Sequence, residues 1–242
     1  MKPGRWVYVP TPLGRARGEE IRKQVSSVWK PPAFYFHLRQ GGHVAALQSH
    51  VGNRYFFRGD IQDFFGRVNR SRVTRGLKKY FSYAKAREMA GDSVVVSPTS
   101  GNTMLPFGFV QSPLLASLVL DESRVGRWLA KSAGRPGLKV SVYVDDILLS
   151  SHDKEFLRAN VLELEALAGA AGLPLNALKS EGPADLVTAF NIELTNGNLA
   201  ITPERIEFFR EAYSSAVSSK VEDGILGYVA SVNPTQVASV TV

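Results

Sequence analysis

The sequence predicts an α+β fold in which helices cover one face of an antiparallel sheet. Short apolar stretches typical of strands alternate along the chain with stretches whose apolar residues recur at helical spacing. The resulting order is strand, helix, strand, helix, hairpin, helix, hairpin. With 242 residues, of which 44% are hydrophobic and 21% charged, the chain can bury a substantial core. We expect one domain, or one domain with a lobed insertion.

The first half of the chain supplies the opening strand and a basic helix. Several prolines and glycines, with Pro31-Pro32 after them, predict an N-terminal arm around a short helix at 19–29. Gln40-Gly41-Gly42 lies between two apolar stretches and predicts a hairpin over 33–38 and 44–47. The run RYFFR predicts a strand over 54–58 that ends at Asp60. Ser71 is expected to cap a helix reaching about residue 90, and a second strand is expected over 93–97.

The second half supplies a central hairpin and the remaining helices. Ser112-Pro113 is typical of a helix start and predicts one long helix to about residue 131. Two apolar runs, 138–144 and 147–151, meet at Asp145-Asp146 and predict a strand pair. An amphipathic helix is predicted over 157–171, closed by Gly172 and Pro174. A hairpin over 189–194 and 199–201, at Asn196-Gly197, and two short helices over 203–215 and 222–232 complete the order.

Composition excludes several classes of chemistry. The chain has no cysteine, so disulfides, thiolate zinc sites and cysteine nucleophiles are excluded. No stretch approaches the ~18 consecutive apolar residues of a membrane helix. Residues 1–5 carry positive charge but lead into no apolar segment and no small-residue cleavage site, so we expect no signal peptide. These features predict a soluble, cytoplasmic protein without a membrane partner.

Positive charge is concentrated in the first 87 residues. They carry eighteen lysines and arginines against four acidic residues, whereas residues 88–242 carry eleven against eighteen. A run of like charge is often only a solvated face. Apolar residues from Val73 to Phe81 are interleaved with these charges at helical spacing, which indicates a folded basic face and favours a polyanion as partner. The run without an intervening acid consists of Arg67, Arg70, Arg72, Arg75, Lys78, Lys79, Lys85 and Arg87.

The paired acids Asp145-Asp146 are the feature that most directly suggests chemistry. An Asp pair is common as ordinary turn chemistry. This turn, however, lies between two buried strands, where a divalent cation would offset the repulsion of adjacent anions. Asp60 ends an aromatic strand, where an acid is often only a cap, but it converges with Asp145 if the two strands are neighbours. Two carboxylates on rigid strands are usual ligands of Mg²⁺, and two such ions suit phosphoryl transfer.

Four segments between Asp60 and Ser180 resemble the ordered motifs of reverse transcriptases. Tyr143-Val144-Asp145-Asp146 resembles the Tyr-x-Asp-Asp signature, and Asp60-Ile61-Gln62-Asp63-Phe64-Phe65 is similar to the first palm motif. The segment 105–113, LPFGFVQSP, resembles the second motif, usually Leu-Pro-Gln-Gly-x-x-x-Ser-Pro. The segment 173–180, LPLNALKS, is similar to a following motif with the pattern Leu-Asn-x-x-Lys. The likeness points to bacterial retron, group II intron and, above all, defence-associated (abortive-infection) enzymes.

The resemblance implies a right-hand polymerase with fingers, a ferredoxin-like antiparallel palm sheet and a short or incomplete thumb. The implied boundaries are 1–58 for the N-terminal arm and fingers, 59–200 for the palm and 201–242 for the thumb. A fingers-side helix and strand would lie at about 70–104. The resemblance further implies two Mg²⁺ ions, or Mn²⁺ in their place. Its implied partners are dNTPs, an RNA template or structured noncoding RNA, and a DNA product.

The resemblance also assigns roles to matching positions. Asp60, Asp145 and Asp146 would be catalytic and, with Ile61, would hold the metal. Phe65 falls at the steric-gate position, where an aromatic ring excludes a 2′-hydroxyl; the alternative is a core phenylalanine. Lys179 would stabilise charge or donate a proton, the alternative being a solvated lysine. The other nucleotide-binding candidates are Asp63, Phe64, Phe107, Gly108 and Arg39, with His43 a weaker one. The nucleic-acid-binding candidates are Arg67, Arg70, Arg72, Arg75, Lys78, Lys79 and Tyr143.

Two departures from the family pattern bear on function. Phe107 replaces a glutamine that normally lies beneath the nascent base pair, which bears on templating. Only about forty residues follow the hairpin at Asn196-Gly197, so the thumb would grip a duplex poorly. A structured RNA, a partner protein or a second copy of the chain would then be needed for stable binding.

These sequence features are compatible with three functions. The first is a Mg²⁺-dependent, RNA-directed DNA polymerase that extends a 3′-hydroxyl or a protein-priming hydroxyl, acting in bacterial antiphage defence. The alternative is a catalytically silent RNA-binding subunit of a ribonucleoprotein, which three mutually repelling acids disfavour. A cyclase or other nucleotidyltransferase on a similar palm also uses paired acids, but the 105–113 segment and the thumb-like tail disfavour it.

Overall fold

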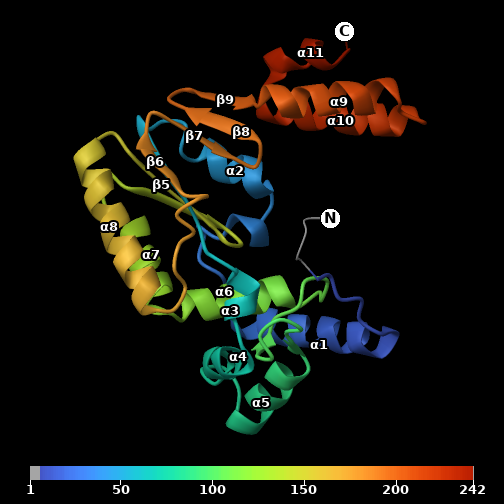
Figure 1. Ribbon diagram of the computed structural model, residues 1–242, viewed down its shortest axis with the longest axis vertical. Coiled ribbons are helices and arrows are strands. Elements are labelled where there is room, and N and C mark those ends of the chain that lie inside the picture. Colours follow the sequence, from blue (N-terminus) through green and yellow to red (C-terminus); the bar gives the residue numbers. More distant parts are fainter. Residues whose placement is uncertain (1–5, 242) are drawn as a thin grey trace.

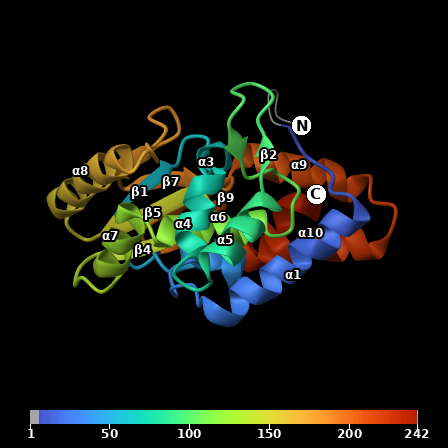
Figure 2. The same cartoon turned by 90° about the horizontal axis from the view of Figure 1, so that it is seen from below.

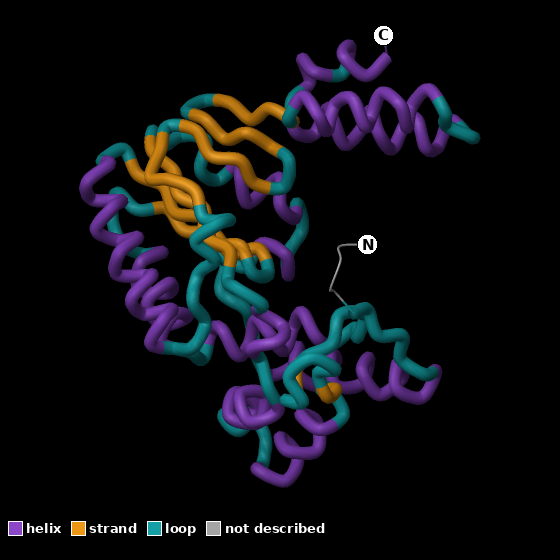
Figure 3. Tube along the Cα trace, viewed as in Figure 1, coloured by secondary structure: helices purple, strands orange, loops and turns teal. Residues whose placement is uncertain are grey.

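Four antiparallel strands form the main sheet, in the order β4-β5-β1-β6 (Figure 1, Figure 3). The structure, a computed structural model, describes residues 6–241; residues 1–5, where we expect no signal peptide, lie outside the described part. β1 pairs with β5 so that Asp60 lies opposite Asp146. The strands are β1 (Tyr55–Asp60), β4 (Lys139–Tyr143), β5 (Asp146–Ser151) and β6 (Glu181–Ala184). The first three confirm the strands predicted from the sequence.

Alternate residues of this sheet contribute to two separate hydrophobic cores. Successive side chains of a strand point to opposite faces. Phe57 and Leu149 accordingly lie in the larger core, whereas Phe56 and Leu148 lie in the smaller one. Burial on both faces explains why β5 has a continuous apolar run rather than an alternating pattern.

Helices α7 (Arg124–Ala133) and α8 (Lys154–Ala170) cover the face that carries the larger core (Figure 1). They follow α6 (Ser112–Asp121), most of whose residues are buried. The prediction of one long helix from Ser112 is wrong, because a short connection between Asp121 and Arg124 interrupts the helix and separates α6 from α7. The Ser123 hydroxyl accepts a hydrogen bond from the Gly126 amide at 3.1 Å and starts the second helix there.

The helix predicted from Ser71 to about residue 90 is also two helices, α4 (Arg70–Leu77) and α5 (Tyr83–Gly91). Asn69, not Ser71, caps α4, because its side chain accepts from the Arg72 amide at 3.0 Å. Ser82 caps α5. The buried residues of the two segments would fall on roughly opposite sides of one continuous helix, so a break is needed to bury both. Seen from below, α4 lies against α5 and α6 (Figure 2).

The hairpin predicted over 33–38 and 44–47 is wrong. The first segment makes one parallel bridge, from Tyr35 to Val142, and continues into the 3₁₀-helix η1 (Phe36–Leu38). The second forms α2 (Gly42–Gln48), which contacts β4. Gly41 precedes α2 with a φ of 91°, and a Cβ there would lie 2.6 Å from the Ala45 Cβ. The glycine pair therefore starts a helix instead of turning a hairpin, and tertiary packing overrides the strand-like pattern.

A second antiparallel sheet of three strands joins the last helices to the main sheet. It consists of β7 (Leu186–Ala189), β8 (Ile192–Thr195) and β9 (Asn198–Ile201), and it confirms the hairpin predicted at Asn196-Gly197. α9 (Pro203–Ser214) and α10 (Ser219–Val232) confirm the two predicted helices and extend away from the main sheet (Figure 1). Residues of α2, this sheet and the helix pair make up most of the smaller core, together with Phe56 and Leu148 of the main sheet.

The remaining elements are short except for the first helix. α1 (Pro12–Val28) starts earlier than predicted because Thr11 caps it, accepting a hydrogen bond from the Gly14 amide at 3.1 Å. The strand predicted over 93–97 is confined to two residues. The other elements are α3 (Phe64–Arg67), β2 (Val95–Val96), β3 (Thr103–Met104), η2 (Pro234–Gln236) and α11 (Ala238–Thr241). None of the helices between residues 6 and 241 is long and apolar enough to span a bilayer.

Candidate functional site

The paired acids lie at the tight turn between β4 and β5. Only Val144 and Asp145 separate the strands, because Tyr143 pairs with Asp146. Val144 has a φ of 59° and Asp145 has no positive φ, which is the pattern of a type II′ hairpin turn. A β-branched residue in this conformation stores strain on the order of 1–3 kcal/mol. The turn that carries Asp145 is therefore stiff and depends on its surroundings.

Asp60 reaches the same place from β1. Asp60 is buried, with 6% of the residue exposed, and its carboxylate accepts hydrogen bonds from Lys179 Nζ at 3.2 and 3.3 Å. The Ile61 amide donates to the Asp145 carbonyl at 2.8 Å, and the Asn176 amide donates to the Asp60 carbonyl at 2.7 Å. Backbone hydrogen bonds thus tie the end of β1 to the turn on one side and to the segment 173–180 on the other.

A polar cavity of about 120 Å³ lies where these segments meet. All four segments that resemble family motifs contribute to it. The residues lining it are Asp60, Ile61, Asp63, Phe64, Phe65, Phe107, Asp145 and Lys179. Each of these eight is a catalytic, metal or nucleotide-binding candidate from the sequence, so the structure brings most of that set to one place.

Aromatic side chains form one wall of this cavity. The rings of Phe65 and Phe107 lie 4.6 Å apart between centroids, so the residue that replaces the usual glutamine packs on the residue that the resemblance places at the steric gate. Phe64 and Phe65, which are neighbours in the sequence, are both buried and both line the cavity. The Phe107 carbonyl accepts a hydrogen bond from the Tyr8 amide at 2.8 Å. Gly108 has a φ of 102°, and a Cβ there would lie 2.2 Å from the Tyr8 carbonyl oxygen, so this position supports the loop and requires glycine.

Asp146 lies beside the cavity but outside its lining. Its Oδ1 accepts a hydrogen bond from Arg58 Nε at 2.8 Å, and Arg58 Nη1 also donates to the Thr188 carbonyl at 3.1 Å. Burial raises the pKa of Asp146, the Arg58 guanidinium opposes that rise, and the negative charge of Asp60 adds to it. Arg58 therefore offsets the charge that makes Asp146 an unfavourable neighbour for Asp60.

Asp60 and Asp145 offer oxygen ligands of the kind that Mg²⁺ prefers. Within residues 6–241, no group of three or more His, Cys, Asp or Glu side chains is arranged to hold a metal by itself. Mg²⁺ usually keeps several waters and takes one or two protein carboxylates together with substrate phosphates, so two converging carboxylates suffice. The Lys179 ammonium already places a positive charge against Asp60. The donor set fits the predicted ion.

Two predicted residues lie away from the cavity. Arg39 donates to the Ala33 carbonyl and lies over the Phe36 ring, 4.9 Å from its centroid, in a separate groove of about 630 Å³. Arg39 is therefore not among the residues that line the cavity around Asp60, and the role in nucleotide binding that the resemblance implies for it stays a prediction. Tyr143 packs against Phe190, at 5.0 Å between ring centroids, in an aromatic cluster next to the turn.

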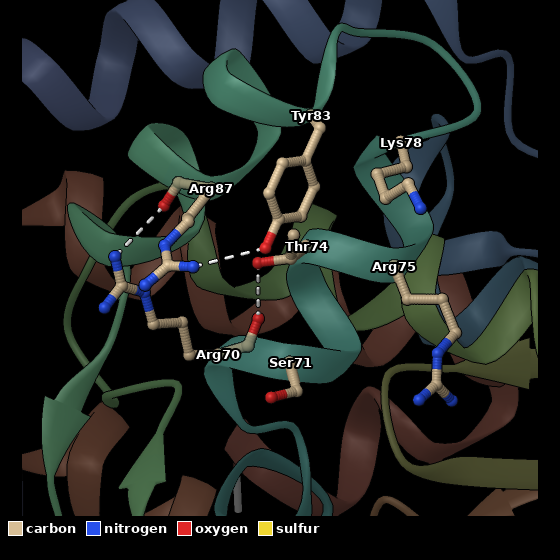
Figure 4. A pocket seen from close by; sticks show the side chains of 7 residues that line it. All are labelled: Arg70, Ser71, Thr74, Arg75, Lys78, Tyr83 and Arg87. Atoms are coloured by element: carbon tan, nitrogen blue, oxygen red, sulfur yellow. Dashed lines mark hydrogen bonds between the residues drawn. The ribbon is translucent and has the colours of Figure 1, made fainter.

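Three of the six basic candidates line one open hollow of about 350 Å³ between α4 and α5 (Figure 4). Arg87, from the same basic run, joins them and donates to the Tyr83 hydroxyl at 3.2 Å. The lining consists of Arg70, Ser71, Thr74, Arg75, Lys78, Tyr83 and Arg87. It contains four cations and no acidic side chain, and it shares no residue with the cavity around Asp60.

The other three basic candidates are engaged within the protein. Arg67 donates to the carbonyl and side chain of Gln62, at the start of its own turn. Arg72 donates to the Ala171 carbonyl at 2.8 Å, at the end of α8. Lys79 forms an ion pair with a glutamate of the α6–α7 connection. The hollow between α4 and α5 thus gathers four cations of the basic run, none of which forms an ion pair within residues 6–241.

Two residues outside the four motif segments also support the site. Arg58 lies two residues before Asp60 on β1. Because residues two apart on a strand lie on the same face, the sequence could have predicted Arg58 near the acids. His37 accepts a hydrogen bond from the Val144 amide at 2.9 Å, across 107 residues of sequence. Nothing in the sequence pairs these two positions, because the contact exists only once η1 packs beside the turn.

An antiparallel sheet, with acids from β1 and from the β4–β5 turn meeting at one cavity, is the palm architecture that the four motif segments imply. The chain belongs to the reverse transcriptase (RNA-dependent DNA polymerase) family, whose sequence pattern matches residues 5–208. The resemblance predicted from the four motif segments is thereby confirmed.

The chain is similar to one curated protein and to several solved structures. The chain is 28% identical over 215 residues to the retron Mx65 reverse transcriptase of Myxococcus xanthus, covering 77% of this chain and 48% of the relative. It thus spans about half the length of that relative. Telomerase from Candida albicans, solved with a fragment of telomeric RNA, has a TM-score of 0.54 at 10% identity, over 91% of this chain and 46% of that one. A foamy viral protease–reverse transcriptase solved with double-stranded DNA has a TM-score of 0.48 at 20% identity, over 78% and 29%. The telomerase likeness confirms the predicted fold class.

Proposed function

We propose that this chain is an RNA-directed DNA polymerase that transfers nucleotides from dNTPs to a 3′-hydroxyl in the presence of Mg²⁺. The observation that carries the proposal is the single cavity lined by Asp60, Asp145, Lys179 and Phe65. Membership of the reverse transcriptase family supports this reaction, and the 28% identity to a retron reverse transcriptase supports a bacterial, retron-like enzyme.

Each residue would serve one part of the transfer. The oxygen of the 3′-hydroxyl attacks the α-phosphorus of the dNTP while the bond to the bridging oxygen breaks and pyrophosphate leaves. Asp60 and Asp145 would hold Mg²⁺, which neutralises charge on the phosphates when bound. Lys179 is half exposed and lies 3.2 Å from Asp60 Oδ1, so its ammonium can turn to the phosphates and offset their charge. Phe65 would pack against the sugar and exclude a 2′-hydroxyl.

Incorporation of labelled dNTPs tests this proposal. The full chain with Mg²⁺ should extend a DNA primer annealed to an RNA template, and omission of the template or the metal should stop extension. Label that stays with the protein after nuclease digestion would identify a priming hydroxyl in the chain. A chain that binds RNA but incorporates nothing on any template, with Mg²⁺ or Mn²⁺, would overturn the polymerase. The catalytically silent RNA-binding subunit would then be the function.

We propose RNA as the partner of the hollow between α4 and α5. Four cations surround it without an acid in the lining, which favours phosphate. Tyr83 is 56% exposed and offers a ring on which a base can stack. Because the hollow and the catalytic cavity have no residue in common, binding and nucleotide transfer can be altered separately.

Replacing Arg75, Lys78 and Arg87 together by glutamine is expected to weaken RNA binding and its salt dependence. Each lost phosphate contact to a single strand lowers the slope of log K against log salt by about 0.7, so three lost contacts lower it by about 2. Fluorescence anisotropy of a labelled RNA, titrated at several salt concentrations, measures both quantities.

A matched variant controls for the loss of three charges. It carries glutamine at three exposed cations of α7 and α8, namely Lys131, Lys154 and Arg158. This variant should keep the slope of the original chain. An equal fall of the slope in both variants would show that net charge, and not the hollow, determines RNA binding.

Antiphage defence, in the cytoplasm of a bacterium, is the biological role that we attach to this proposal. Its support is the resemblance of the motif segments to defence-associated reverse transcriptases. The helix pair α9–α10 is a short thumb in this proposal, and a partner protein or a second copy of the chain would extend the grip on a duplex.

A further inference from the structure

We propose that His37 positions the catalytic turn, because its imidazole holds Val144 in the conformation that directs Asp145 into the cavity. This inference rests on the proposed function, since it assigns His37 a part in the same reaction. The imidazole is not among the groups that line the cavity, so His37 acts through the turn and is a positioning residue.

The turn needs a support from outside itself. Val144 occupies the first central position of a two-residue hairpin turn with a φ of 59°, where a type II′ turn ordinarily has glycine. A β-branched side chain is strained in this conformation, which persists only where the surrounding structure enforces it. The strain lies one residue before Asp145, so its release would move the carboxylate.

His37 provides this support through a series of hydrogen bonds. The Val144 amide can only donate, and this determines which imidazole nitrogen carries the proton. The Val144 amide donates to His37 Nδ1 at 2.9 Å, so the neutral imidazole carries its proton on Nε2. His37 Nε2 lies 2.7 Å from Ser117 Oγ, and that hydroxyl donates to the Pro113 carbonyl at 2.8 Å. Burial lowers the pKa of His37 to about 4, and a hydrogen bond with the Val142 backbone raises that pKa by less, so the imidazole is neutral at neutral pH.

The surroundings of His37 also determine the orientation of its ring. Tyr35 and Tyr143 contact the imidazole edge to face, at 6.0 and 5.8 Å between ring centroids. Pro113 lies in the first turn of α6 and Ser117 one turn further along, and the loop that carries Phe107 leads directly into this helix. The imidazole therefore links the turn with Asp145 to the helix that follows the aromatic wall of the cavity.

A double-mutant cycle between His37→Phe and Val144→Gly tests the proposal. Phenylalanine keeps an aromatic ring between Tyr35 and Tyr143 but removes both nitrogen atoms. Glycine adopts positive φ without strain, so a turn with Val144→Gly no longer needs the hydrogen bond. We expect His37→Phe to lower kcat for dNTP incorporation by about 10- to 100-fold, with KM for dNTP little changed, and by less than about threefold in the Val144→Gly background.

Two further variants distinguish positioning from general packing. His37→Asn keeps an oxygen that can accept from the Val144 amide, so it should retain most of kcat. His43→Phe changes the other histidine that contacts Tyr143, also at 5.8 Å, and should show no coupling to Val144→Gly. If His37→Phe does not fold, Ser117→Ala replaces it in the cycle, because it removes the partner of His37 Nε2.

Thermal unfolding of the same four chains gives a readout that does not depend on activity. We expect Tm to fall by a few degrees on His37→Phe and by less in the Val144→Gly background. Coupling in Tm without coupling in kcat would show that His37 only stabilises the turn, and would overturn the positioning role. An equal loss of kcat in both backgrounds would overturn it as well. Absence of incorporation by the original chain would instead refute the proposed function, whatever the Tm values show.

Discussion

Replacement of Asp145 by asparagine is expected to lower dNTP incorporation by about 10³-fold or more, the scale on which loss of one electrostatic stabiliser acts. Asparagine has nearly the same shape and leaves the β4–β5 turn in place, but it removes one of the three carboxylates that line the cavity, which are Asp60, Asp63 and Asp145. Single-turnover extension of a labelled primer on an RNA template measures the loss. Tm and RNA affinity should stay close to those of the original chain, because the turn and the α4–α5 hollow are unchanged.

The matched control for this substitution is Asp185→Asn. Asp185 is exposed, lies between β6 and β7 and lines none of the cavities described above. Its replacement removes the same charge from the chain and should leave incorporation within about twofold, as surface substitutions usually do. Incorporation by Asp145→Asn at more than a tenth of the original rate would contradict a metal-holding role for Asp145.

Replacement of Phe65 by alanine is expected to raise incorporation of rNTPs relative to dNTPs by about 100-fold, within the range that one missing side-chain contact can change selectivity. Phe65 is 7% exposed, lines the cavity and packs on Phe107. Removing its ring opens the space in which a 2′-hydroxyl would stand. The measurement is the ratio of kcat/KM for an rNTP to that for the matching dNTP, in which the concentration of active protein cancels.

Using a ratio matters because Phe→Ala in a core typically lowers the free energy of unfolding by about 3–5 kcal/mol, which reduces the amount of folded, active protein. Phe64→Ala is the control, since Phe64 is equally buried and lines the same cavity. It should lower stability similarly but leave the rNTP-to-dNTP ratio near that of the original chain. The same rise in ratio for both variants would show that the cavity as a whole, and not the Phe65 ring, selects the sugar.

The residues of the cavity could be predicted because they lie in short segments of recognisable order. Four short segments supply these residues, and each can be recognised from its own sequence. They are Asp60 to Phe65, the loop with Phe107, the turn with Asp145 and the segment with Lys179. The antiparallel pairing of β1 with β5 then brings them together. In contrast, the errors in the fold lie at 33–47, 71–90 and 112–131, where caps and packing divided or redirected stretches whose local pattern was ambiguous.

By itself, the sequence determined the family, three of the four strands of the main sheet and the identity of the eight residues in the cavity, because each depends on residues close together in the chain. Only the tertiary structure decided which charges are available. It paired Asp146 with Arg58, held Arg39 in another groove and left the α4–α5 hollow without an acid. It also placed His37 against Val144. These outcomes depend on side chains brought together from distant parts of the chain, and burial and hydrogen bonding between such groups leave no local pattern to read.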